Sequence, residues 1–322
     1  MVRLRRSELT GPGIRRIRSG GGFAYRDPSG GPVAADDRAR IEGLVIPPAW
    51  TDVWISPFAN GHIQATGVDA AGRRQYLYHP DWTARESRVK FDRALELAAS
   101  LPSARRSVTR DLRLPGLPRE RVMAAGFRML DAAALRVGTE RYAEQHGSIG
   151  LTTLRGAHAS VVGGRVVSLD FPGKSGQEWS SEIDDEDLAA AIAQLKRRGP
   201  RAHLLSWQDD GGWHPVTAAE LNDEVRRRTH GEFTSKDFRT LRGTIAAAES
   251  LAETGEQRSE SARRRAVAQA MRAAAEVLGN TPAVARSSYV DPRVVDRFQH
   301  GELLEVASSA SPEAALRRLL TG

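Results

Sequence analysis

Turn-forming residues break up the first ninety residues of the chain, so the segments between them are too short for long helices. Gly, Pro, Asn and Asp predict turns at 27–31, 47–48, 60–61 and 69–72. The segments between these turns carry aromatic and β-branched residues, which favour strands, notably at 53–56, 62–66 and 74–78. We therefore predict a small antiparallel sheet domain over residues 1–90, and we expect Asn60-Gly61 to form a hairpin turn.

The rest of the chain, 91–322, has the pattern of helices. Apolar residues recur at helical spacing through 119–145. Thr234 or Ser235 can cap the helix that follows it, and the Ala- and Arg-rich segment 261–278 stops at Gly279, which suits a C-cap. We predict a second, larger and mainly α-helical domain over 91–322.

A β-rich insert interrupts this helical pattern. Alternating residues predict strands at 152–154, 159–162, 166–171 and 178–183. The segment Pro172-Gly-Lys-Ser-Gly176 predicts the turn between the last two strands and displays Lys174 at its tip. The predicted fold class is α+β: an antiparallel sheet domain followed by a helical domain with a β-hairpin insert.

The chain is basic, with 47 Lys and Arg against 40 Asp and Glu, a net charge of +7 and a sequence pI near 10.2. Arginines cluster at 3–6, 15–18, 73–74, 105–106, 226–228 and 263–265, whereas acidic residues concentrate at 182–187. One interpretation is an ordinary solvated surface. The other is a basic face that binds a polyanion such as nucleic acid. The segregation of charge favours the second interpretation without identifying the polyanion.

Several classes of protein and site are excluded. The sequence contains 0 Cys, which rules out disulfides, thiolate catalysis and cysteine-bound metals. No run is apolar enough to span a membrane and no apolar stretch follows the Arg-rich N-terminus, so we expect a cytoplasmic protein. The His residues lack metal-binding spacing, so we expect no metal site. Gly173-Lys174-Ser175 matches the end of a phosphate-binding loop, but Ser168 replaces its first glycine and a strand follows, so we expect no nucleotide site.

Three cations and a tyrosine remain as candidate catalytic groups. Arg136 begins Arg136-Val-Gly138, Lys174 ends Phe171-Pro-Gly-Lys174, Arg239 lies in Lys236-Asp-Phe-Arg-Thr240, and Tyr289 follows Leu278-Gly-Asn-Thr-Pro282. Taken singly, each has an ordinary interpretation: an arginine on a helix usually pairs with an acid or with solvent, and a tyrosine near a proline usually packs half-buried.

These motifs, in this order, closely resemble those of the poxvirus-like and bacterial type IB DNA topoisomerases, over essentially the whole chain. The resemblance implies that Tyr289 is the nucleophile, that Arg136 and Arg239 stabilise the transition state, and that Lys174 is the general acid. One position departs from the family, because Asn280 stands where His is usual. Asn offers a neutral amide donor in place of a charged one, which puts the rate in question but not the reaction.

The resemblance also implies how the chain meets DNA. Arg74, Gln75, Tyr76 and Tyr78 would lie on the strand that reads the major groove. The two domains would clamp double-stranded DNA and would be joined by a flexible link near 87–92. The protein would act as a monomer at the nucleoid, without cofactor, nucleotide or metal.

The implied reaction is sound chemistry in itself. Attack by a phenoxide on a phosphodiester places charge on the non-bridging oxygens, which two arginines can neutralise. A desolvated lysine beside them can protonate the leaving 5′-oxygen. The resulting 3′-phosphotyrosyl ester conserves the bond energy, so resealing is the reverse attack and needs no ATP.

Two alternatives stay open at this point. A tyrosine recombinase uses the same Arg, Lys and Tyr chemistry, although it usually has a His two residues before its second Arg motif, where this chain has Lys236-Asp-Phe-Arg239. The other alternative is a DNA-binding protein whose catalytic site has decayed at Asn280.

Overall fold

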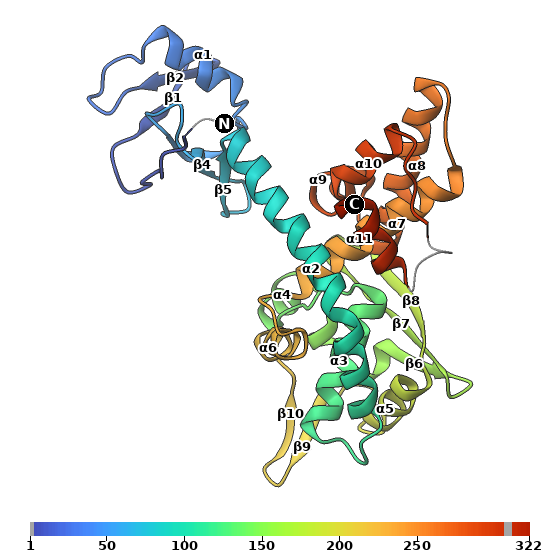
Figure 1. Ribbon diagram of the computed structural model, residues 1–322. Helices are drawn as coiled ribbons and strands as arrows, with labels where there is room; N and C mark the ends of the chain where they lie inside the picture. The colour runs from blue at the N-terminus through green and yellow to red at the C-terminus, as the bar shows by residue number, and fades with distance from the viewer. Residues whose placement is uncertain (1–2, 306–310) are drawn as a thin grey trace. The chain divides into compact units, whose positions relative to one another are not determined.

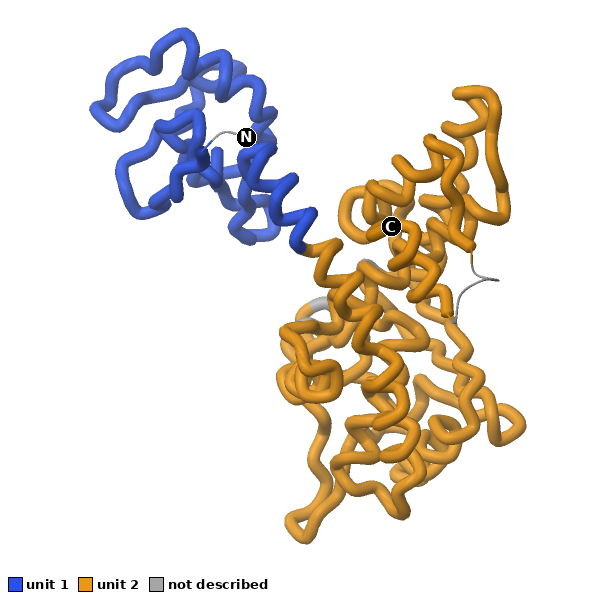
Figure 2. The backbone as a smooth tube through the Cα atoms, in the orientation of Figure 1, with its two compact units in different colours: residues 1–89 blue, residues 90–322 orange. Residues whose placement is uncertain are grey.

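The computed structural model of the chain describes residues 3–305 and 311–322. It divides into two compact units, Met1–Val89 and Lys90–Gly322, which Figure 2 shows in different colours. The first unit contains an antiparallel sheet and the second is mainly helical, so the predicted α+β class is confirmed. Among the described residues, no helix is both long enough and apolar enough to cross a lipid bilayer.

The first unit is built on a five-stranded antiparallel sheet whose strand order is β2-β1-β3-β4-β5. The strands are β1 (Ile14–Ser19), β2 (Gly22–Arg26), β3 (Thr51–Ile55), β4 (Ile63–Val68) and β5 (Arg74–Tyr78). Helix α1 (Ala35–Gly43) contributes Ile41 to a core that also contains Ile14, Val53, Ile55 and Ala65. The turn signals in the sequence did not predict this helix, because only Ile41 of its residues is buried.

The connection from β3 to β4 differs from the expected two-residue hairpin turn. Asn60 and Gly61 lie in a longer loop, 56–62, in which Gly61 N donates to Phe58 O at 3.1 Å. The N-terminal segment pairs with this loop, since Arg5 N donates to Asn60 O and His62 N donates to Arg5 O, each at 2.9 Å. The loop therefore binds the N-terminal segment through backbone hydrogen bonds. The Asn-Gly pair in the sequence does not reveal this tertiary contact.

Helix α2 (Pro80–Leu112) runs through the boundary between the two units. We expected a flexible link near 87–92, but these residues lie inside the helix. The reason is that the segment contains no Gly or Pro, and that Phe91, Leu95 and Ala98 bury one helical face. Residues 87–92 are therefore part of a continuous helix.

The second unit consists of helices around a long core, with two small sheets at its edges (Figure 1). Its helices after α2 are α3 (Arg119–Ala133), α4 (Glu140–His146), α5 (Glu186–Lys196), α6 (Ala218–Thr229), α7 (Ser235–Thr254), α8 (Glu260–Leu278), α9 (Pro282–Ser288), α10 (Pro292–Gln299) and α11 (Pro312–Thr321). Its strands are β6 (Ala159–Val162), β7 (Val166–Pro172), β8 (Glu178–Asp184), β9 (Ser206–Asp209) and β10 (Gly212–Pro215). α7 packs along α8, and Phe238 of α7 meets Phe127 of α3 edge to face, with ring centres 5.4 Å apart.

The strongest local signals predicted the elements of this unit correctly. Strands β6, β7 and β8 form one antiparallel sheet at the predicted positions. The helices capped at Thr234 and Gly279 are α7 and α8. Two predictions were wrong: the expected helix over 119–145 is interrupted after Ala133, and residues 152–154 form no strand, because Leu151–Thr153 is a 3₁₀ turn.

Candidate active site

Arg136 is presented by the break between α3 and α4. Ala134 ends α3 in a left-handed conformation with φ 49°. The carbonyl of Arg136 accepts a hydrogen bond from Leu151 N at 2.9 Å. Gly138, with φ 77°, lies so close to Gly150 that a Cβ on Gly138 would come within 2.8 Å of the Gly150 Cα. Backbone contacts therefore fix the segment that carries Arg136.

Arg239 lies in the first turns of α7, where Thr234 and Asp237 form a capping box. Its side chain is 3% exposed, and its two Nη atoms donate to Ala134 O at 2.6 Å and to Leu278 O at 2.7 Å. These bonds tie the ends of α3 and α8 to α7. The Nε atom is buried and has no hydrogen-bond partner among the described residues. Arg239 therefore joins three helices and keeps one donor available.

Asn280 follows directly after the C-cap of α8. Gly279 has φ 55° there, and a Cβ on it would come within 2.7 Å of the Trp179 ring. Asn280 Oδ1 accepts a hydrogen bond from Arg136 Nη2. Its Nδ2 atom is buried without a hydrogen-bond partner in the described part of the chain. The amide thus orients Arg136 and retains a donor of its own.

Tyr289 lies at the C-terminal end of α9 and packs against α7. Gly243 of α7 permits this approach, since a Cβ on it would come within 3.2 Å of the Tyr289 Cβ. The carbonyl of Tyr289 accepts a hydrogen bond from Thr244 Oγ1 at 3.0 Å, and its N–H donates to Ala285 O at 2.9 Å. The guanidinium carbon of Arg239 lies 5.1 Å from the centre of the phenol ring.

Lys174 lies in the turn between β7 and β8, as the sequence predicts. Gly173 N closes this turn by donating to Gln177 O at 2.7 Å. The Lys174 side chain is exposed, whereas we expected a desolvated lysine. Its position at the tip of a two-stranded projection accounts for the exposure.

One pocket of about 420 Å³ brings these groups together, because Arg136, Lys174, Arg239 and Tyr289 all line it. Lys236 also lines the pocket, and none of its described lining residues is acidic. Asn280 is not part of the pocket wall and acts through its bond to Arg136. A concave site with four cations and no carboxylate is suited to an anion.

Burial and the neighbouring cations shift the pKa values of the titratable side chains in the pocket. Burial opposes ionisation of the phenol, but Arg239, Arg136 and Lys174 outweigh it and lower the pKa of Tyr289 below its ordinary value. Burial, together with repulsion from Arg136, lowers the pKa of Arg239 to about 10. Burial likewise lowers the pKa of Arg136, against the opposing effect of Tyr289. The site therefore makes ionisation of the phenol easier than it is in water, and it would gain stability from a bound anion.

The DNA contacts expected on β5 fall on two different faces of the strand. Arg74, Tyr76 and Tyr78 alternate with Gln75 and are exposed, with Tyr76 at 40% and Tyr78 at 44%. The two tyrosine rings stack with centres 6.1 Å apart. Gln75 is half-buried and donates to Asp69 Oδ2 at 2.8 Å. On the exposed face Arg74 pairs with Asp52 at 2.9 Å, so Tyr76 and Tyr78 are the side chains of the four that remain available, and Gln75 is not.

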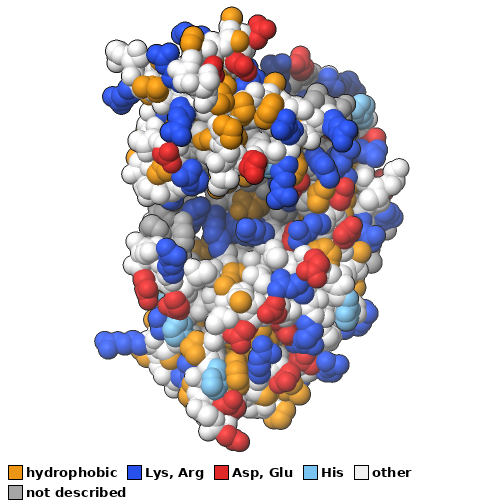
Figure 3. All heavy atoms as spheres, turned by 90° about the vertical axis from the view of Figure 1, so that its left-hand side faces the viewer, with side chains coloured by type: hydrophobic (Ala, Val, Ile, Leu, Met, Phe, Trp, Pro, Cys, Tyr) orange, Lys and Arg blue, Asp and Glu red, His pale blue; other side chains and the backbone are white. Residues whose placement is uncertain are grey.

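Two arginines from the sequence clusters form internal ion pairs and so do not contribute to a basic face. Arg228 is buried and bonds to Glu224 at 2.6 Å and to Asp111 at 2.9 Å. Arg105 bonds to Asp131 at 2.7 Å and to Glu313 at 2.6 Å. On the surface drawn in Figure 3, Lys and Arg side chains lie among Asp and Glu side chains. Clustering along the sequence is thus a poor guide to a continuous basic surface in this chain.

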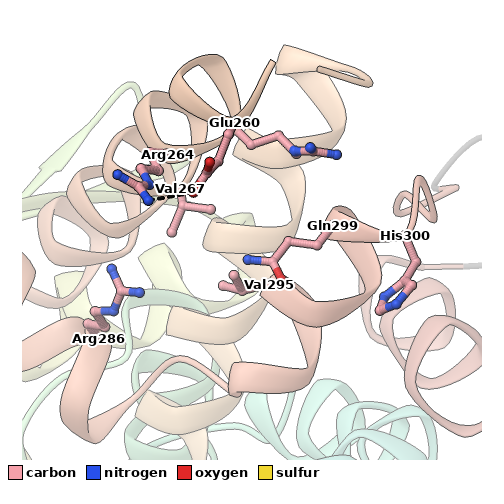
Figure 4. Close-up of a pocket in the computed structure, with 8 residues that line it drawn as sticks. Glu260, Arg264, Val267, Arg286, Val295, Gln299 and His300 are labelled. Carbon is pink, nitrogen blue, oxygen red and sulfur yellow. Dashed lines mark hydrogen bonds and ion pairs between the residues drawn. The ribbon is translucent and has the colours of Figure 1, made fainter. Parts of the chain in front are cut away.

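A second pocket, of about 760 Å³, lies among α8, α9 and α10 (Figure 4). Arg286, three residues before Tyr289, lines this pocket, together with Arg263 and Arg264. Arg264 is bonded to Glu260 of the same helix. No tyrosine lines this pocket among the described residues, so it is not the site of the nucleophile. The described residues also contain no group of three or more His, Asp or Glu that could hold a metal ion.

Two lysines near the pocket were missing from the residues predicted from the sequence. Lys236 lies three residues before Arg239 on α7, so the helical spacing could have pointed to it. Lys90 of α2 donates to Ser288 O at 3.1 Å, beside Tyr289. No sequence signal reveals this contact, because 198 residues separate the two partners.

Known proteins match both parts of the chain. Residues 80–303 match the family described as the catalytic core of eukaryotic DNA topoisomerase I, and residues 22–69 match the N-terminal domain of bacterial DNA topoisomerase IB. DNA topoisomerase 1B of Acanthamoeba polyphaga mimivirus is 33% identical over 296 residues, which cover 89% of this chain and 88% of that protein. DNA topoisomerase 1 of Schizosaccharomyces pombe is 24% identical over half of this chain, which corresponds to 19% of that protein. A family match over most of the chain and a relative aligned almost end to end establish that this chain belongs to the type IB DNA topoisomerases.

Proposed function

We propose that this type IB topoisomerase relaxes supercoiled DNA by cleaving one strand with Tyr289 and resealing it. The observation that carries the proposal is the pocket in which Tyr289 lies with Arg136, Lys174 and Arg239 and with no acidic lining residue. The neighbouring cations lower the pKa of Tyr289, which favours the nucleophilic phenoxide. A scissile phosphate supplies the negative charge that this pocket lacks.

The transition state would be held by donors that the folded chain already positions. Arg239 uses its Nη atoms to bind the carbonyls of Ala134 and Leu278, which leaves Nε as a preorganised donor for a non-bridging oxygen. Arg136 presents its guanidinium from the pocket wall, while Asn280 Nδ2 offers a neutral N–H. Such donors need no reorganisation as charge develops on the phosphate.

Lys174 is our proposed general acid. It lines the same pocket as Tyr289 but comes from a different element, the turn between β7 and β8. In-line displacement requires the attacking and leaving oxygens to lie on opposite sides of phosphorus. A donor on a separate projection can therefore reach the leaving 5′-oxygen while Tyr289 forms its ester with the 3′-phosphate.

Resealing would reverse these steps, with the 5′-hydroxyl attacking the phosphotyrosyl ester and Lys174 taking back a proton. The ester conserves the energy of the broken bond, so the cycle needs no ATP. The four pocket residues all belong to one unit of one chain, which supports a catalytically competent monomer. We further propose that the two units close as a clamp on duplex DNA, with Arg74, Tyr76 and Tyr78 among the contacts of the first unit.

Trapping the covalent intermediate tests this proposal. Denaturing the protein during reaction with labelled duplex DNA should yield a protein–DNA adduct from the wild type and none from Tyr289→Phe. DNA affinity should change little in this variant, since binding is spread over many phosphate contacts. Adduct formation by Tyr289→Phe would exclude Tyr289 as the nucleophile. Exchange of strands between two duplexes by the wild type would instead favour a recombinase-like activity.

A further inference from the structure

Three hydrogen bonds hold the backbone on both sides of the nucleophile, Tyr289. Tyr289 N–H donates to Ala285 O at 2.9 Å, and Tyr289 O accepts from Thr244 Oγ1 at 3.0 Å. The third contact is Lys90 Nζ, which donates to Ser288 O at 3.1 Å. Lys90 is the charged donor of the three, and a hydrogen bond from a charged donor is roughly twice as strong as a neutral one.

The carbonyl of Ser288 needs a hydrogen-bond partner from outside α9. α9 spans only Pro282–Ser288, and Tyr289 leaves the helical conformation with φ −136° and ψ −28°. The last carbonyls of a helix have no partner within it, and a cation near them also interacts favourably with the helix dipole. So short a helix gains little stability from its own hydrogen bonds. The orientation of Tyr289 therefore depends on contacts from other elements.

We propose that Lys90 is a positioning residue for the nucleophile, holding the Ser288–Tyr289 peptide of α9 against α2 so that the phenol faces the scissile phosphate. This inference rests on the proposed role of Tyr289. The ammonium itself is held in place, because it is half-buried and lies 4.1 Å from the centre of the Phe91 ring.

Two further ion pairs hold α2 at this position. Arg293 of α10 bonds to Asp92 at 2.9 Å and to Asp291 at 2.7 Å. Arg93 bonds to Asp237, the capping residue of α7, at 3.0 Å. α2 thus contacts both the segment that carries Tyr289 and the helix that carries Arg239. Asp92 and Arg93 follow Lys90 closely on α2, so these ion pairs hold the part of the helix that carries Lys90.

Lys90 does not line the pocket, but its charge interacts with the phenol of Tyr289. The charged groups that face Lys90 are Tyr289 at the end of α9 and Asp291 at the start of α10. Burial lowers the pKa of Lys90, and both of these groups oppose that shift. Loss of the ammonium removes this interaction with Tyr289. The effects of Arg239, Arg136 and Lys174 on the phenol remain. The pKa of Tyr289 should therefore rise in a variant without this charge.

The test compares Lys90→Met, which keeps the apolar stem, with Lys90→Arg, which keeps the charge and a donor. Single-turnover cleavage of duplex DNA, at saturating protein and across a range of pH, is the measurement. Lys90→Met should cleave about ten- to a hundredfold more slowly, the loss expected for a hydrogen bond from a charged group. The pH at which the cleavage rate of Lys90→Met rises should be higher than in the wild type, because the pKa of Tyr289 should be higher. Lys90→Arg should recover most of the rate and the original profile.

The matched control is Arg272→Met, which removes a cation from an exposed position on α8 that has no bonded partner among the described residues. It should cleave like the wild type. DNA affinity, measured for Lys90→Met combined with Tyr289→Phe, should equal that of Tyr289→Phe alone.

Three results would overturn the inference. The first is an unchanged cleavage rate in Lys90→Met, and the second is a loss of rate that disappears when the protein concentration is raised, because the defect would then lie in DNA binding. The third is an equal loss of rate in the Met and Arg variants with an unshifted pH profile. Adduct formation by Tyr289→Phe would instead contradict the proposed nucleophile, whatever the Lys90 variants do.

Discussion

Replacing Arg239 by Met separates its structural role from its role at the phosphate. Met is unbranched and apolar, so it can fill most of the buried space without charge. The change removes the two hydrogen bonds to Ala134 O and Leu278 O, and it removes the Nε donor that has no protein partner. The first loss should affect folding, and the second should affect catalysis.

The expected change in stability is small because two effects oppose each other. Two hydrogen bonds from a charged donor contribute about 1.5–3 kcal/mol each, or about 3–6 kcal/mol together. Burial beside Arg136 lowers the pKa of Arg239 to about 10, which corresponds to a cost of about 3 kcal/mol for keeping the charge. The free energy of unfolding should therefore fall by about 0–3 kcal/mol.

Catalysis should fall much further. Removing one preorganised donor that faces developing charge typically costs about 10²- to 10³-fold in rate. Urea denaturation measures the stability change, and single-turnover cleavage of duplex DNA measures the catalytic one. Arg242→Met is the matched control, since Arg242 lies one turn along α7, donates to Asp131 O at 2.8 Å and does not line the pocket. It should lose stability but cleave normally. A folded Arg239→Met that cleaves within about threefold of the wild type would refute the reasoning.

Three further variants test other parts of the site. Lys174→Ala should slow cleavage about 10²- to 10⁴-fold on ordinary DNA. It should recover on a substrate with a 5′-bridging sulfur, because a thiol pKa near 8.5 lets the thiolate leave without a proton; equal slowing on both substrates would exclude the general-acid role. Asn280→His should leave single-turnover cleavage equal or faster, since a neutral imidazole can also accept one hydrogen bond and donate another; a hundredfold loss would contradict this. Gly138→Ala should destabilise the protein by more than about 1–3 kcal/mol in urea, because backbone strain adds to the clash with Gly150. Gly164→Ala has a similar φ of 71° and open space around it, so it isolates the strain, and an equal loss in both would exclude the clash.

The sequence predicted those parts of the fold that local signals determine. The strands β6 to β8 follow from alternation, and α7 and α8 follow from the caps at Thr234 and Gly279. The break after α3 has no such signal, because Ala134 has no intrinsic preference for a left-handed conformation. Tertiary contacts stabilise it instead, including the hydrogen bond that the Ala134 carbonyl accepts from Arg239.

For the candidate site too, some features could be predicted from the sequence and others depend on the tertiary structure. Resemblance to a family pointed to Arg136, Lys174, Arg239 and Tyr289, and these residues line one pocket although they are far apart in the sequence. Periodicity alone would not have selected them. Which partner each cation has depends on the tertiary structure. Arg228 forms an internal ion pair, whereas the arginines of the pocket have no acidic neighbour among its described lining residues.

The continuity of α2 affects how the protein can be divided into fragments. The match to the catalytic core begins at residue 80, which is the first residue of α2, whereas the compact second unit begins at Lys90. A fragment cut at the unit boundary would start inside a helix and leave Lys90 in its fraying first turn. Cutting before Pro80 preserves the whole helix, with proline at its start, where a missing N–H costs nothing. The preferred place to separate the two parts is therefore the end of β5, and not the point where their contacts divide.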